Sequence, residues 1–277
     1  MTNPAIVRRP EQSEGPALPC RPEQSEGPAP RPHSTSPPRF AYARLATAAD
    51  RGAWSVERDV RWTDVDAERA HARPELLAQL REAALIESYH PVHLAWMLDE
   101  VWDDVDACVA VSLELYEGFK HFHALRSYLD AVGYAPAITD AEIVACRARA
   151  RRVGPSGTLV ERLVEFMLSE HLASYFFRRV GEQAEDPVLA DLLALIAADE
   201  VRHAQAASDL IAARIAREPA LIAVVLDAAL DFHHFGEQVV DDVPVAFPGD
   251  PLAIRSFARR IERLCGVRLV DHIKGRL

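Results

Sequence analysis

Two acids and a histidine interrupt an apolar helical pattern in the second half of the sequence. In the stretch ADEVRH, residues 198–203, Glu200 and His203 lie on a stripe that apolar residues mark at steps of three and four. A spacing of three puts both side chains on one helix face, one turn apart, so both can reach one metal ion. Asp199 beside them could accept the outer N–H of a ligand histidine.

Carboxylates interrupt three other apolar stripes in the same way. Glu87 and Glu117 are 117 − 87 = 30 residues apart, and Glu170 and Glu200 are 200 − 170 = 30 residues apart. An isolated ionised carboxylate on a core-facing stripe would cost several kcal/mol, so each needs a partner, and a metal ion would serve. For Glu87 and Glu170 the alternative is an ion pair with an arginine such as Arg202. Two equal helical hairpins with these residues can hold two cations. The predicted ligands are Glu87, Glu117, His121, Glu170, Glu200 and His203.

Two further residues lie beside these predicted ligands. His90 follows Glu87 by three residues and could add a nitrogen ligand, the alternative being a polar histidine of the core. Glu114 lies one turn before Glu117 and could be a further ligand or an acid that supports one, although the expectation is a solvated position.

Capping residues predict where the elements begin and end, and strand signals are scarce after residue 74. Residues 39–73 receive no regular element, and their aromatic residues indicate a segment packed across the other helices. Four long helices with auxiliary ones predict an all-α bundle. The predicted helices cover about 74–102 with a kink at Pro91, 104–131, 140–151, 158–181, 187–217, 219–235 and 251–265.

Composition separates the first 38 residues from the rest. They hold ten of the nineteen prolines and a direct repeat, RPEQSEGPA, at 9–17 and 21–29. This pattern predicts a disordered tail at 1–38 and a single helical domain at 39–277, with a core bundle at about 74–217 and further helices at 218–277.

Charge and cysteine usage narrow the functional classes. The net charge of −11 disfavours nonspecific binding to nucleic acid. No apolar run is long enough to span a bilayer and none resembles a secretory signal, so we expect a soluble, cytoplasmic protein. The four cysteines are far apart, which argues against a zinc site and against a disulfide framework.

With these residues, the sequence resembles the ferritin-like di-iron carboxylate proteins, which include acyl carrier protein desaturases, multicomponent monooxygenases, arylamine N-oxygenases and rubrerythrins. The matching positions are Glu87, Glu117 with His121, Glu170, and DEVRH, whose last four residues fit the Glu-x-x-His motif of the family. The resemblance covers about residues 74–217 and implies a ferritin-like four-helix bundle with auxiliary helices.

One position departs from the family pattern. The first Glu-x-x-His would need a histidine at position 120, where the chain has Lys120 and places His121 one residue later. A π-bulge eased by Gly118 could absorb the extra residue, or Glu117 and His121 could converge on one metal as an i, i+4 pair. If neither holds, the site is mononuclear or degenerate.

The resemblance implies an oxygen-activating enzyme that binds two iron ions, with manganese as the alternative, and uses O2. It would oxidise a small or carrier-bound organic substrate, apolar or amine-containing, by hydroxylation, desaturation, N-oxygenation or deformylation. A separate ferredoxin or reductase would supply electrons, because the chain has no Gly-rich dinucleotide motif and no Cys-based cluster motif.

Two other functional classes are compatible with the sequence. One is a metal-handling protein without an organic substrate, like iron-storage or peroxide-reducing relatives, and the other is a helical interaction protein with a degenerate site. The 277 − 217 = 60 residues after the fourth long helix are enough to build a substrate pocket, which favours the enzyme. Phe176 and Phe177 are expected to be packing aromatics, with a substrate channel as the alternative. A homodimer is also considered, and neither a nucleic acid nor a membrane is expected as a partner.

Overall fold

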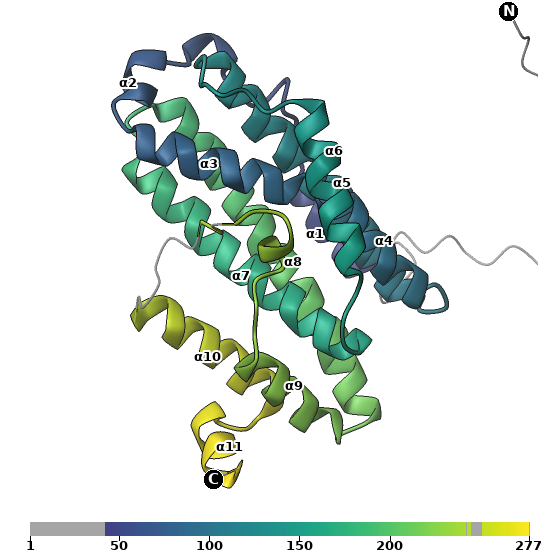
Figure 1. Ribbon diagram of the computed structural model, residues 1–277. Helices are drawn as coiled ribbons and strands as arrows, with labels where there is room; N and C mark the ends of the chain where they lie inside the picture. The colour runs from purple at the N-terminus through teal and green to yellow at the C-terminus, as the bar shows by residue number, and fades with distance from the viewer. Residues whose placement is uncertain (1–41, 242, 245–250, 277) are drawn as a thin grey trace, which may run out of the picture. The chain divides into compact units, whose positions relative to one another are not determined.

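A computed structural model describes residues 42–241, 243–244 and 251–276 (Figure 1). The fold is all-helical, and no strand occurs in these ranges. The predicted tail at 1–38 lies outside the described residues. The helices are α1 (Ala43–Gly52), α2 (Ala67–His71), α3 (Pro74–Glu87), α4 (His90–Glu100), α5 (Val105–Ala131), α6 (Asp140–Val153), α7 (Leu159–Gln183), α8 (Pro187–Arg217), α9 (Leu221–Leu230), α10 (Pro251–Cys265) and α11 (Leu269–Arg276), with the 3-10 helices η1 (Trp62–Asp64) and η2 (Phe235–Gln238).

The predicted caps determine where the long helices begin. The side chain of Asp104 accepts the N–H of Ala107 at the start of α5. Thr158 forms a reciprocal capping box with Glu161 at the start of α7. Asp186 caps α8, whose first residue is a proline. The predicted starts of these three helices are confirmed.

The predicted helix over 74–102 is two helices. Proline has no N–H to donate, and its ring clashes with the carbonyl four residues earlier, which for Pro91 is that of Glu87. Accordingly α3 ends at Glu87 and α4 begins at His90. The break leaves both Glu87 and His90 buried.

Elements outside the long helices were predicted less well. The segment 39–73, which received no element, contains α1, α2 and η1, and α11 was not predicted. The helix predicted over 219–235 is shorter, because α9 ends at Leu230 and η2 follows separately. These elements are short, and α1 and α9 have no side-chain cap, so little in the local sequence marks their ends.

The long helices pack side by side and enclose the core. In Figure 1, α7 runs beside α8, while α5 contacts α3, α4 and α8. Helix α1 packs on α5 and α8, and α10 packs on α7, α8 and α9. Within the described ranges, no helix is long and apolar enough to cross a membrane.

We expect the Asp186→Ala variant to lose about 2–3 kcal/mol of unfolding free energy. Asp186 is fully buried, accepts the N–H of Val188 as a helix cap, and accepts the hydroxyl of Tyr128 at 2.7 Å. Its removal leaves that buried hydroxyl without an acceptor. Urea unfolding followed by circular dichroism measures the loss. The control Asp66→Ala removes the cap of short α2 and an exposed ion pair with Arg69, and it should cost about 1 kcal/mol or less, so equal losses would contradict this account.

Candidate metal centre

Seven ionisable side chains meet between α3, α4, α5, α7 and α8. Each is at most 5% exposed, a degree of burial that carboxylates and imidazoles reach only when they have partners. The cluster consists of Glu87, His90, Glu114, His121, Glu170, Glu200 and His203.

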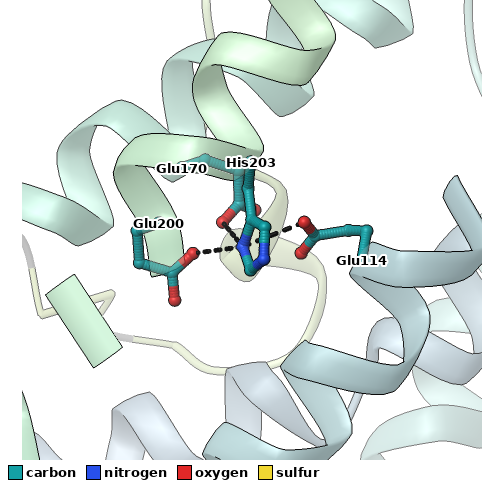
Figure 2. A group of neighbouring side chains, drawn as sticks. All are labelled: Glu114, Glu170, Glu200 and His203. Atoms are coloured by element: carbon teal, nitrogen blue, oxygen red, sulfur yellow. Dashed lines mark hydrogen bonds and ion pairs between the residues drawn. The ribbon is translucent and has the colours of Figure 1, made fainter. Parts of the chain in front are cut away.

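Four of these side chains form a first ligand group around the ring of His203. Figure 2 shows His203 facing three carboxylates. Its Nδ1 atom lies 2.9 Å from an oxygen of Glu114, 2.9 Å from Oε2 of Glu200 and 3.8 Å from an oxygen of Glu170. One ligand atom from each residue lies within 4.8 Å of the others, so the group could hold a metal ion.

A second group shares one carboxylate with the first. His121 Nδ1 lies 2.9 Å from Oε1 of Glu200 and 3.7 Å from Oε2 of Glu87. These three residues could also hold a metal ion. One oxygen of Glu200 faces His203 and the other faces His121, so Glu200 belongs to both groups.

Several atoms of the cluster fit a metal better than they fit one another. His121 Nδ1 and Glu200 Oε1 are 2.9 Å apart, yet within the described residues neither makes an aligned hydrogen bond. A buried polar atom without a partner costs about 1–3 kcal/mol, and a cation can accept lone pairs from several directions at once. The other atoms of this kind are Glu87 Oε2, both ring nitrogens of His90, and both carboxylate oxygens of Glu114.

The pKa values of the cluster also indicate that its carboxylates need positive charge nearby. Burial, together with the nearby carboxylate of Glu170, raises the pKa of Glu200 to about 8. Burial opposes the charged imidazolium, but the surrounding carboxylates nevertheless raise the pKa values of His121 and His203 well above the ordinary value. Without a metal, protons therefore supply the positive charge that the carboxylates need.

Asp199 holds the ring of His121 from its outer side. His121 Nε2 lies 3.0 Å from Asp199 Oδ2, and the same oxygen accepts the indole N–H of Trp54 at 2.8 Å. Lys120 lies 2.9 Å from this oxygen, and Arg202 donates to the other. Burial would raise the pKa of Asp199, but His121 and these cations hold it well below its usual range. Asp199 thus directs Nδ1 of His121 toward the cluster.

Glu117, a predicted ligand, lies outside both groups. One of its oxygens lies 2.8 Å from Nε2 of His203, and the other accepts from Arg202 at 2.8 Å. It therefore holds His203 from the outside as Asp199 holds His121.

Glu114 was expected to be solvated, and this was wrong, because it is 3% exposed and lies in the first group. Helix α5 is a regular α-helix through this region, without the π-bulge considered from the sequence. Seven residues make nearly two turns, so Glu114 lies within about 20° of His121 around the helix, whereas Glu117 is offset from His121 by about 40° in the other direction. The spacing of seven therefore marks Glu114 as a candidate, but it does not choose Glu114 over Glu117.

Gly118 has a different role from the one considered for it. His90 lies 3.2 Å from Glu87 and 3.9 Å from both Glu114 and Glu170, so it borders both groups without belonging to either. A Cβ atom at position 118 would lie 1.9 Å from Nδ1 of His90. Gly118 therefore makes room for the His90 ring.

The chain matches no protein-family model and no curated protein sequence. A functional interpretation therefore depends on the chemistry of the cluster. Mixed carboxylate and imidazole ligands suit iron and manganese better than they suit calcium, which prefers oxygen ligands alone.

We expect Gly118→Ala to lower metal content by half or more while the helices remain folded, because the new methyl group must displace His90 into the carboxylates. Metal analysis and circular dichroism after manganese loading would measure this. The matched control is Gly181→Ala, also inside a helix, whose Cβ would meet its nearest neighbour at an ordinary 3.4 Å. Equal metal content in both variants would contradict the assigned role.

Metal binding should tighten as the pH rises from about 6 to about 8. The raised pKa values of Glu200, His121 and His203 mean that bound protons compete with the cation and must leave when it binds. Calorimetric titration with Mn²⁺ in buffers of different ionisation enthalpy counts the released protons. An affinity that does not change with pH, without proton release, would speak against these ligands.

Proposed function

We propose that the protein is a non-haem di-iron enzyme that activates O2 and oxidises an apolar or amine-containing organic substrate. The observation that carries this proposal is the position of Glu200, whose two oxygens face two separate groups of buried ligands. One metal would lie among Glu114, Glu170, Glu200 and His203, and the other among Glu87, His121 and Glu200.

The proposed fold is a ferritin-like four-helix bundle. In this interpretation α3 with α4, α5, α7 and α8 are the four long members, and the remaining helices are auxiliary. The packing of α5 against α3, α4 and α8, and of α7 against α8, supports it. Each of these members contributes at least one side chain to the cluster, as expected when a metal site is built inside a bundle.

When bound, a pair of irons would pass electrons from the external donor and from the substrate to O2. The chain's own residues would orient and shield that pair. Asp199 and Glu117 fix the rings of His121 and His203 from their outer nitrogens. The ring of Trp54 stacks parallel to that of His121, with 6.2 Å between the centroids, and helps to keep water away from the cluster.

External electrons are required, because nothing in the sequence resembles a flavin, nicotinamide or iron–sulfur binding motif. We therefore propose a separate ferredoxin or reductase as a partner. An apolar cavity lined in part by Glu87 favours an organic substrate over iron storage, since storage needs no such cavity.

Anaerobic loading with ferrous iron should give about two irons per chain in the wild type. Glu200→Ala should fall below one, because this side chain belongs to both groups, and its O2-dependent turnover should be lost. Metal analysis and circular dichroism separate loss of iron from loss of fold. The control His233→Ala, at an exposed position, should load like the wild type. Less than one iron per wild-type chain, or full loading of Glu200→Ala, would overturn the proposal.

A further inference from the structure

A cavity of about 340 Å³ lies against the Glu87 side of the cluster. Its wall comes from α3, α7, the segment after α9, and α10. Cavities of this size hold small organic ligands. Glu87 lines the cavity and also belongs to the second ligand group, so a ligand bound here would lie next to that metal position.

The wall of this cavity is almost entirely apolar. Phe176, Phe232 and Phe257 line it together with aliphatic side chains, and among the described lining residues there is no lysine or arginine. An anionic head group would therefore have no partner of opposite charge. Oε2 of Glu87 makes no aligned hydrogen bond among the described residues, but it lies 3.2 Å from His90 and 3.7 Å from His121, so two imidazole rings of the cluster already face it and an ammonium group would compete with them. Burying an unpaired charge here would cost several kcal/mol.

His234 supplies a hydrogen-bond donor on this wall. Its Nδ1 accepts the N–H of Gly236 at 3.0 Å. Burial lowers the pKa of His234 to about 4, so the ring is neutral near pH 7 and carries its hydrogen on Nε2. Among the described residues, no acceptor is hydrogen-bonded to this nitrogen.

A second cavity, on the side of the cluster covered by α1, is a poorer match for an apolar ligand. It measures about 190 Å³ and is lined by Arg44, Arg202 and Asp209 as well as by Glu114 and Glu117. Because charged side chains line the smaller cavity and apolar side chains line the larger one, we assign the apolar ligand to the larger cavity.

We propose that the larger cavity binds an uncharged, mainly apolar substrate and that His234 donates a hydrogen bond to a hydroxyl or carbonyl oxygen of that molecule. The identification of this ligand as the substrate rests on the proposed function, but its binding requires no metal. Within the substrate classes considered from the sequence, this inference favours neutral apolar compounds over protonated amines and carboxylates.

Three probes test whether the cavity selects an uncharged ligand, because they share one alkyl chain and differ in head group: 1-decanol, decanoate and decylammonium. Calorimetric titration of the metal-free full chain near pH 7 should give a Kd for 1-decanol at least about tenfold lower than for either charged probe. Equal or tighter binding of a charged probe would overturn the assigned class. Failure of all three to bind would overturn the site.

Two variants test the location. Ala173→Trp should fill the cavity and abolish binding of 1-decanol, whereas Val144→Trp, at an exposed position on α6, should leave it unchanged. His234→Asn keeps an acceptor for the N–H of Gly236, but its shorter side chain has no donor at the position of Nε2, so the Kd should rise about fivefold. Unchanged binding in Ala173→Trp or in His234→Asn would contradict the placement.

These measurements separate the inference from the proposed function. Binding of 1-decanol to a chain that takes up no iron would leave the cavity assignment intact and overturn only the enzyme. Conversely, two irons per chain without binding of any probe would overturn only the cavity assignment. In the Mn²⁺-loaded protein, NMR lines of bound 1-decanol should broaden, and sharp lines from the bound probe would contradict a position next to the cluster.

Discussion

The repulsion among four buried carboxylates is the constraint on which the rest of this structure depends. Glu87, Glu114, Glu170 and Glu200 are each at most 5% exposed, so water does not screen their charges. Either protons or cations must balance them, and burial beside the carboxylate of Glu170 accordingly raises the pKa of Glu200. A pair of divalent cations would remove the same repulsion and would also satisfy those atoms of the two ligand groups that lack hydrogen bonds.

Positive charge also surrounds the cluster from outside. Arg202 donates to both Asp199 and Glu117, so one guanidinium links the two carboxylates that hold the histidines. Lys120 pairs with Asp199 and lies over the ring of Trp54, 4.3 Å from its centroid. Lys120 therefore has a structural role, because it helps to neutralise the acid behind His121.

Sequence patterns predicted the helices and most of the cluster because both follow from burial at helical periodicity. Glu170, Glu200 and His203 interrupt apolar stripes, and the structure brings them together. Helical periodicity does not decide whether Glu114 or Glu117 enters the cluster. That choice depends on how α5 is rotated against its neighbours, and local sequence does not determine this rotation. The hydrogen bond from Trp54 to Asp199 joins residues 145 positions apart, so local sequence patterns could not predict it either.

The central claim is that Glu200 bridges two metal positions. Anomalous diffraction at the iron absorption edge, from crystals grown with ferrous iron under anaerobic conditions, tests it most directly. The account predicts two anomalous peaks on either side of the Glu200 carboxylate, one beside Glu114, Glu170 and His203 and the other beside Glu87 and His121. A single peak at one group, or no peak within the cluster of a fully folded chain, would contradict it.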